Sequence, residues 1–330
     1  MTLDLPLIFT ALMGFAILAY VVLDGYDLGV GMLMAAANEK EQDLMVSSIG
    51  PFWDANETWL VLGVGILLVA FPVAHGIILG ALYLPVATML IGLMFRGVAF
   101  EFRLKALGWH RELWNWLFWF GSFLTSFAQG LMLGRYITGF ESGFAYFLFA
   151  LLTGAGLCGG YVLLGATWLV LKTEGTLQKK AIAWAKWGLL WVALGVVMVS
   201  LSTPLVSETV RMKWFDFPRT LGLMLLPAAT VAIGVAVWID LRALQHSSAR
   251  REWLPFAGTV AIFTLAFLGL AYSLFPYVVI DRITIWEAAA HPSALRFVLW
   301  GALIVVPLII AYTAFSHRVF WGKARAGLYE

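Results

Sequence analysis

The sequence predicts an all-α integral membrane protein with about nine transmembrane helices. Of its 330 residues, 62% are hydrophobic and only 12% are charged, whereas a soluble domain carries about 25% charged residues. So few charges cannot cover a water-soluble globule, and the remaining surface must therefore face lipid. The apolar stretches are long and continuous rather than alternating, which favours helices over a membrane β-barrel.

Each apolar stretch is close to the roughly 20 residues that a helix needs to cross a bilayer core of about 30 Å. The predicted spans are 6–30, 55–74, 77–95, 114–134, 144–171, 184–203, 220–239, 254–275 and 295–316. The turn between the second and third, Phe71–Gly76, is so short that one bent span is the alternative. No linker or low-complexity run interrupts the chain, which predicts one membrane domain over 1–330.

The distribution of basic residues predicts the orientation, because cytoplasmic loops carry an excess of Lys and Arg. With the N-terminus outside, most of the 21 Lys and Arg residues fall in cytoplasmic segments. We therefore predict a periplasmic N-terminus and a cytoplasmic C-terminus. An odd number of spans agrees, since it places the two ends of the chain on opposite sides.

The residue inventory excludes several classes of function. A net charge of +2 is too small to suggest a nucleic-acid partner, and the single cysteine, Cys158, excludes an internal disulfide. No Walker-type loop, dinucleotide fingerprint or nucleophile–base pair is present. Haem ligands usually project from helix interiors, but the histidines all fall at span ends or in loops: His75, His110, His246, His291 and His317. We therefore predict that this chain itself binds no haem, metal or other cofactor.

Carboxyl groups at membrane depth are the main indication of function. Asp24 and Asp27 lie inside the first predicted span, and Asp54 and Glu57 lie at the start of the second. Spacing of i, i+3 places the two members of each pair on one helix face. Because consecutive spans run antiparallel, both pairs lie near the same, cytoplasmic surface. A carboxylate at a helix centre costs about 2.5–3.5 kcal/mol on insertion scales, so four such groups require an explanation.

Three interpretations of these acids stand beside one another. In the first, they line a hydrated proton path from the cytoplasm, because clustered carboxyls in a low dielectric can exchange protons near neutral pH. In the second, they are structural: Asp54 caps the second helix, and charged residues at the cytoplasmic end of the third span neutralise the group, namely Arg96, Glu101 and Arg103. The third is a stand-alone proton-coupled transporter, although no inverted repeat is seen and the acids do not lie at the midplane.

Ordered motifs then connect the chain to a known family. Near the N-terminus they are Asp24-Gly-Tyr-Asp27-Leu-Gly29-Val-Gly31, Gly-Pro-Phe-Trp53-Asp54-Ala-Asn56-Glu57-Thr-Trp59 and Phe95-Arg96-Gly-Val-Ala-Phe-Glu101-Phe-Arg103. Near the C-terminus they are Phe275-Pro276-Tyr-Val-Val, Ile283-Thr284-Ile-Trp286-Glu287-Ala-Ala and Pro307-Leu-Ile-Ile-Ala311-Tyr312-Thr313. Together they resemble subunit II of the cytochrome bd-type quinol oxidases over nearly the whole chain. The form of the Arg96 motif resembles the branch called cyanide-insensitive.

The resemblance implies a haem-free, multi-pass subunit of the bacterial inner membrane, built as two four-helix bundles plus one additional helix. The family's terminal oxidase serves aerobic respiration by oxidising quinol and reducing dioxygen to water. Its subunit I is expected to hold two b-type haems, one d-type haem and the quinol-oxidising loop. A small single-helix subunit and a quinone bound to the present chain stay open, and the sequence locates no site for the quinone.

The resemblance also implies a role for this subunit: it stabilises subunit I and provides a proton path from the cytoplasm. The path residues are Asp27 and Asp54, joined by Asp24 and Glu57, with supporting residues Trp53, Asn56, Arg96, Glu101 and Arg103. Two positions depart from the family pattern. Ala55 replaces a glycine found in many members, and Ile280-Asp281-Arg282 replaces expected prolines, so this outer loop is expected to dock differently on its partner.

Overall fold

The computed structural model describes residues 3–217, 219–246 and 251–325. Within these ranges, nine helices are long and apolar enough to cross a membrane. They are α1 (Leu5–Leu33, extended by the 3₁₀ turn η1, Met34–Ala36), α3 (Trp53–Ala70), α5 (Tyr83–Arg103), α6 (Trp109–Ile137), α7 (Phe144–Lys172), α8 (Gly175–Val206), α11 (Leu225–His246), α12 (Leu254–Leu274) and α14 (Pro292–Val319). The predicted all-α membrane fold is confirmed.

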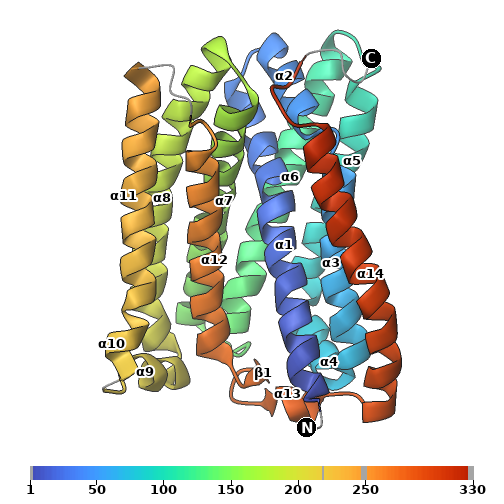
Figure 1. Cartoon of the computed structure of the whole chain (residues 1–330), viewed down its shortest axis with the longest axis vertical. Coiled ribbons are helices and arrows are strands. Elements are labelled where there is room, and N and C mark those ends of the chain that lie inside the picture. The colour runs from blue at the N-terminus through green and yellow to red at the C-terminus, as the bar shows by residue number, and fades with distance from the viewer. Residues whose placement is uncertain (1–2, 218, 247–250, 326–330) are drawn as a thin grey trace.

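Short elements close the two ends of the bundle. At one end lies α2 (Glu39–Ile49), which begins with a capping box formed by Asn38 and Glu41. At the other end lie α4 (Pro72–Ala81), α9 (Glu208–Trp214), α10 (Arg219–Leu223), α13 (Ile285–Ala288) and the antiparallel strands β1 (Tyr277–Val279) and β2 (Ile283–Thr284) (Figure 1). The carboxyl-bearing half of α1 is at the α2 end.

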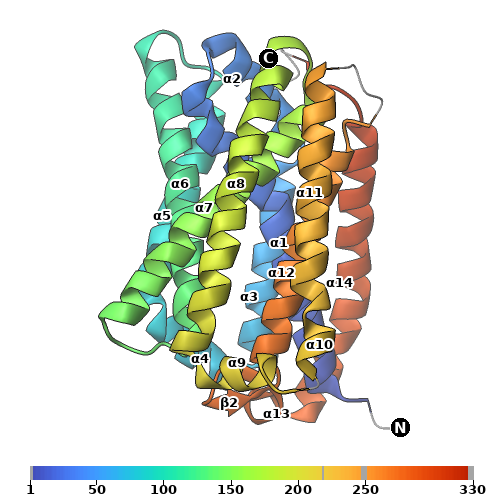
Figure 2. The ribbon, with the colours of Figure 1, turned by 90° about the vertical axis from the view of Figure 1, so that its left-hand side faces the viewer.

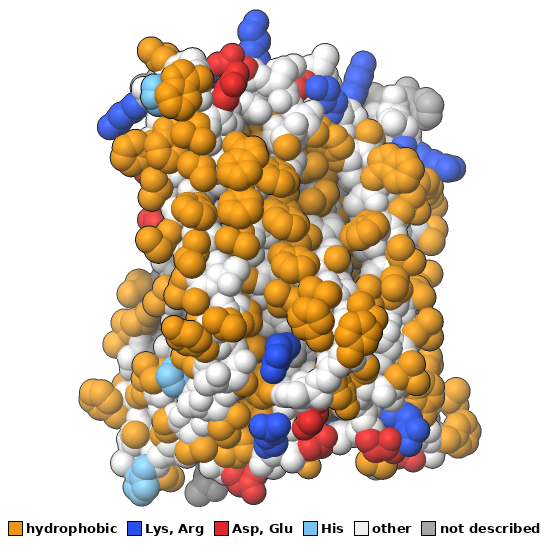
Figure 3. Space-filling view, turned by 180° about the vertical axis from the view of Figure 1, so that it is seen from behind, with side chains coloured by type: hydrophobic (Ala, Val, Ile, Leu, Met, Phe, Trp, Pro, Cys, Tyr) orange, Lys and Arg blue, Asp and Glu red, His pale blue; other side chains and the backbone are white. Residues whose placement is uncertain are grey.

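The spanning helices form two groups of four with one helix outside them (Figures 1 and 2). In one group α7, α8, α11 and α12 pack in a ring. In the other, α1 packs against α3 and α6, and α6 packs against α5, while α14 contacts α1 and α3 from outside. The face of the molecule in Figure 3 carries a broad hydrophobic belt, and most of the charged side chains on that face gather at its two ends. This distribution matches a bilayer core bounded by two aqueous faces.

The described chain begins and ends at opposite ends of the bundle (Figure 1). Asp4, near the start, accepts a hydrogen bond from the indole of Trp286 in α13. Ala324, near the end, donates a backbone hydrogen bond to the carbonyl of Lys172 at the other end of the bundle. This placement agrees with an odd number of spans, and the assignment of the α2 end to the cytoplasm stays a prediction.

The structure differs from the predicted spans between residues 71 and 103. The second spanning helix ends at Ala70, the short helix α4 follows, and the third spanning helix is Tyr83–Arg103 rather than 77–95. The reason is Pro72, which has no N–H to continue the hydrogen-bond ladder of α3 and instead begins α4 at its first position. Two separate spanning helices are therefore present, and not one bent span.

A close crossing of α1 and α7 fixes the position of the acids. A Cβ atom added to Gly29 would lie 1.8 Å from the carbonyl oxygen of Tyr161, and one added to Gly165 would lie 2.4 Å from the carbonyl carbon of Gly29. Only glycine allows such a backbone-to-backbone approach. The turn of α1 that carries Asp24 and Asp27 is therefore held directly against α7.

Candidate functional site

Three of the four predicted path acids gather near the guanidinium of Arg96. Its Nη1 lies 2.6 Å from Oδ1 of Asp24, and its Nη2 lies 2.6 Å from Oε1 of Glu57. Arg96 and Asp24 are almost completely buried, whereas 29% of the Glu57 side chain is exposed. The indole of Trp53 lies beside the guanidinium, 5.9 Å from ring centroid to Cζ. One cation thus joins α1, α3 and α5 at a single point.

Asp27, the third acid, is bound by an amide rather than by a cation. Nδ2 of Asn56 donates to Oδ2 of Asp27 at 2.8 Å and to the hydroxyl of Tyr26 at 2.9 Å. The Asp27 side chain is completely buried. Its second oxygen, Oδ1, has no hydrogen-bond partner in the part of the chain that the structure describes. A buried carboxyl with one free oxygen is a site where a proton can be added without breaking an existing hydrogen bond.

A second hydrogen-bonded branch leaves the cluster toward the middle of the bundle. The hydroxyl of Tyr161 donates to Oε1 of Gln129 at 2.6 Å, and Nε2 of Gln129 donates to the hydroxyl of Tyr20 at 2.7 Å. Tyr20 lies one helical turn before Asp24 on the same face of α1. The sequence analysis missed this branch, although Gln129, an amide inside an apolar span, is the kind of residue that could have revealed it.

A third branch reaches the last spanning helix. Nε2 of His317 lies 3.4 Å from the hydroxyl of Tyr26, and its Nδ1 lies 2.9 Å from the carbonyl oxygen of Thr313. The ring also stacks on Phe52, with centroids 4.5 Å apart. Both ring nitrogens thus face partners within this chain. No group of three or more His, Cys, Asp or Glu side chains within the described ranges could hold a metal ion.

The remaining predicted residues lie outside the cluster. Asp54 is exposed in the first turn of α3, where Phe52 and not Asp54 occupies the N-cap position, so the structural interpretation of Asp54 as the cap does not hold. Glu101 is exposed on α5 and forms no hydrogen bond or ion pair with any described residue. Arg103 binds Asp43 of α2 at 2.6 Å and donates to Asn115 of α6. Its charge therefore compensates that of Asp43 on α2, and not those of the carboxyl cluster.

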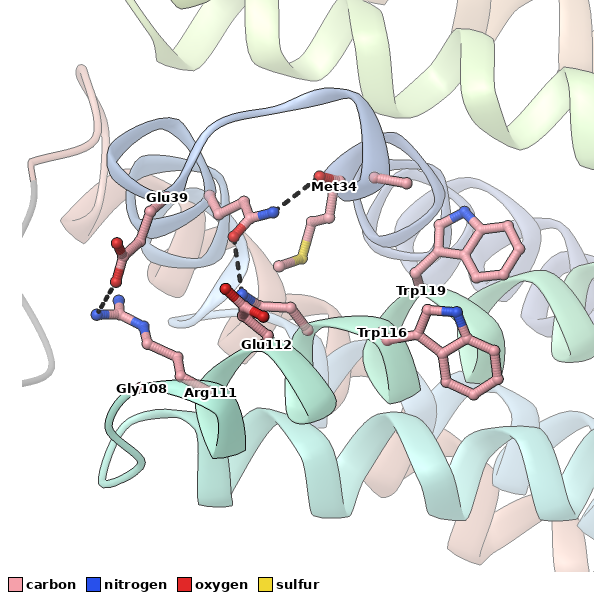
Figure 4. Close-up of a pocket in the computed structure, with 10 residues that line it drawn as sticks. Met34, Glu39, Gly108, Arg111, Glu112, Trp116 and Trp119 are labelled. Atoms are coloured by element: carbon pink, nitrogen blue, oxygen red, sulfur yellow. Dashed lines mark hydrogen bonds and ion pairs between the residues drawn. The ribbon is translucent and has the colours of Figure 1, made fainter.

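Ion pairs anchor α2 next to the cluster, and besides the two that Arg111 of α6 forms, with Glu39 (Figure 4) and with Asp43, two more come from α5 and α8. One is the Arg103–Asp43 pair, and the other joins Nζ of Lys180 to Oε2 of Glu41 at 2.7 Å. Burial acts to raise the pKa of Glu41, but hydrogen bonds from Lys180 and from the backbone of Asn38 outweigh burial, so the pKa lies below its usual value. The surface helix is thus tied to α5, α6 and α8.

Comparison with known proteins gives a consistent result over the length of the chain. The family profile described as cytochrome bd terminal oxidase subunit II matches residues 5–320. "Cytochrome bd-I ubiquinol oxidase subunit 2" of Escherichia coli K12 is 28% identical over 97% of this chain and 95% of that protein. "Cytochrome bd ubiquinol oxidase subunit 2" of Bacillus subtilis is 29% identical over 90% of each chain. In fold, the chain is similar to the bd oxidase structure from Geobacillus thermodenitrificans, with a TM-score of 0.75, 14% identity and coverage of 97% of this chain and 100% of that one.

Proposed function

This chain belongs to the cytochrome bd terminal oxidase subunit II family, and from that premise we propose that it stabilises subunit I and provides its proton path from the cytoplasm. The chain is subunit II of a quinol oxidase complex, an oxidoreductase of the bacterial inner membrane. In the proposal, subunit I carries the two b-type haems and the d-type haem, and oxidises quinol while reducing dioxygen. The present chain forms one membrane domain that carries protons to it.

The observation that carries the proton path is the charge of the buried cluster. Three carboxyls lie around the single guanidinium of Arg96: those of Asp24 and Glu57 pair with it, and that of Asp27 lies near enough to interact with its charge. If all three were ionised, the cluster would carry two uncompensated negative charges. Uncompensated charge in a low dielectric is strongly unfavourable, so the cluster favours holding at least one proton. A buried group of acids with a resident, exchangeable proton is what a relay requires.

The exposure of the acids suggests a direction for the path. Asp54 is exposed at the start of α3, and Glu57, one turn further along the same helix, is 29% exposed and contacts Arg96. Asp24 and Asp27 lie beyond them and are completely buried. We infer that protons are taken up at Asp54 and Glu57 and passed to Asp24 and Asp27.

The position of one exposed carboxylate, that of Glu101, suggests where subunit I contacts this chain. Glu101 is exposed on α5 between exposed apolar neighbours such as Val98 and Phe102. A carboxylate is costly against lipid hydrocarbon, and a partner subunit that covers this part of α5 would remove that contact. We infer that subunit I packs here, near the acids of α3. A hydrophobic contact of this kind would also stabilise subunit I.

The experiment compares Asp27→Asn, Asp54→Asn and Glu57→Gln in the purified complex. Each should lower oxygen-reduction turnover, because an amide cannot release the relayed proton, while the haem absorption of the complex stays largely intact. Glu208→Gln, an exposed acid of α9 at the opposite end, serves as the control and should retain turnover. Full turnover in both Asp27→Asn and Asp54→Asn would refute the proton path, and loss of haem would favour a purely structural role.

A reduced-minus-oxidised spectrum separates the roles of the two subunits. The complex purified through a tag on this chain should show haem b and haem d bands, and this chain expressed alone should show none. Haem in the lone chain would contradict the assignment of the haems to subunit I.

A further inference from the structure

The geometry of the buried cluster distinguishes one carboxyl as the holder of its proton. Asp24 and Glu57 are each paired with Arg96 at 2.6 Å, and an ion pair needs a charged carboxylate. In Asp27, Oδ2 accepts from the neutral amide of Asn56, and Oδ1 has no hydrogen-bond partner among the described residues. A proton on Oδ1 therefore removes a buried charge without breaking a hydrogen bond or an ion pair.

The amide nitrogen of Asn56 is surrounded by acceptors. Its Nδ2 lies 2.8 Å from Oδ2 of Asp27 and 2.9 Å from the hydroxyl of Tyr26. The carbonyl oxygen of Leu23 lies 3.3 Å away. Because the carbonyl and Oδ2 can only accept, the orientation of the amide is fixed. The Tyr26 oxygen thus receives an N–H, and its own O–H needs a different acceptor.

The imidazole of His317 supplies that acceptor. Its Nδ1 lies 2.9 Å from the carbonyl oxygen of Thr313, which can only accept, so Nδ1 carries the ring proton. In the neutral ring, Nε2 then has the free electron pair, and it lies 3.4 Å from the Tyr26 hydroxyl. The ammonium of Lys172 lies beside the Phe52 ring on which His317 stacks, and this cation disfavours a second positive charge there. The Tyr26 O–H therefore points toward α14.

Packing fixes the ring of Tyr26 and leaves only its O–H bond free to turn. The side chain is completely buried, stacks on Trp168 with centroids 4.1 Å apart and meets Phe256 edge-on at 5.9 Å. If the acceptor on His317 were removed, the hydroxyl proton would turn to the carboxyl of Asp27. That carboxyl is a close neighbour, because one amide nitrogen binds both oxygens.

We propose that His317 is a positioning residue, which acts through Tyr26 to keep the resident proton of the cluster on Oδ1 of Asp27. This role rests on the proton path proposed above. While His317 accepts the hydroxyl proton, Asp27 receives no hydrogen bond from Tyr26. Such a bond would stabilise the carboxylate form and weaken the hold of Asp27 on its proton. The helix α14, which lies outside both groups of four helices (Figure 1), thus reaches the site through one imidazole.

The test follows the infrared carbonyl band of the protonated Asp27 carboxyl in the purified complex. Asp27→Asn identifies the band by removing it. In His317→Phe the ring can still stack on Phe52, but the acceptor is gone. A pH titration of the band should then show proton binding weakened about tenfold, near the lower end of what a hydrogen bond to a charged group contributes. His317→Gln provides an amide oxygen as acceptor and should restore the parent titration.

A double-mutant cycle separates this role from a purely structural one. Tyr26→Phe has no hydroxyl to turn, so adding His317→Phe in that background should leave the titration unchanged. Lost packing would act in both backgrounds, and that result would overturn the proposal. So would a parent-like titration in His317→Phe, or the absence of any band that Asp27→Asn removes. The matched control is His75→Phe, at a partly buried histidine of α4 at the opposite end, which should change nothing.

The infrared band reports the proton on Asp27 whether or not turnover depends on it. Full turnover in Asp27→Asn would argue against the proton path and would leave the assignment of the proton to Asp27 standing. The two failures can therefore be told apart.

Discussion

Removal of the cation at Arg96 tests how the buried cluster is held together. Arg96→Met keeps most of the side-chain volume but leaves the carboxylate of Asp24, which is completely buried, without its ion pair. Breaking a buried pair by removing one partner destabilises a protein by about 3–5 kcal/mol. We expect a loss of that size in the free energy of unfolding.

Substitution of Asp24 and substitution of Glu57 should differ in how much stability they restore to Arg96→Met. Asp24→Asn removes the buried charge that Arg96→Met leaves without a partner. The double variant Arg96→Met/Asp24→Asn should therefore recover most of the lost stability. Glu57 is 29% exposed, and solvent screening limits its pair to about 1 kcal/mol or less. Glu57→Gln should therefore recover little.

The assay is a double-mutant cycle on the purified complex, with the free energy of unfolding measured by denaturant titration in mixed micelles. Glu208→Gln at the opposite end provides the reference for a charge change without burial. A loss below about 1 kcal/mol in Arg96→Met, or equal rescue by the two acid variants, would refute the reasoning that Asp24 depends on Arg96 for its charge.

Three further predictions concern other parts of the fold. Gly29→Ala places a Cβ 1.8 Å from a backbone oxygen and should destabilise the complex by about 3 kcal/mol. The control is Gly234→Ala on α11, which has no atom within 4 Å of the added Cβ and should be neutral or slightly stabilising. Equal thermal unfolding midpoints for the two variants would contradict this prediction. Gln129→Leu should cost about 1–3 kcal/mol in thermal unfolding, because it leaves two buried tyrosine hydroxyls unpaired, and Gln129→Glu should lose less. The pKa of Glu41 is lowered on folding, so its stabilising contribution is complete above the usual value of 4.5 and is lost as the pH falls below it. In Glu41→Gln, the thermal unfolding midpoint should therefore fall less steeply as the pH drops below 4.5. The same acid dependence in the variant and the parent protein would argue against the ion pair with Lys180.

The spanning helices could be predicted from the sequence because the bilayer sets both their length and their hydrophobicity. The segment after Ala70 could not be placed in the same way. Its residues are mostly apolar through α4 and into the first half of α5, so hydropathy does not distinguish a short helix at the membrane end from the beginning of a span. Pro72 was the local signal for the break.

The site was predicted only in part, and the reason is helix rotation. The i, i+3 spacing correctly placed Asp24 and Asp27 on one face of α1, and it indicated that Glu57 lies near them. It did not show that α3 turns Asp54 outward, because that angle depends on packing against other helices. The partners Gln129 and His317 lie 109 and 291 residues from the tyrosines that they contact, and no local pattern records such distant contacts.

The backbone contact between Gly29 and Gly165 makes α1 and α7 a single mechanical unit. Neither helix can turn about its own axis without forcing a carbonyl group into the neighbouring backbone. Movements during the catalytic cycle must therefore leave the backbone of Asp24 and Asp27 stationary relative to α7. Spectroscopic labels on these two helices should report an unchanged separation, and in the proposed proton path any motion is left to the side chains of Arg96 and Glu57.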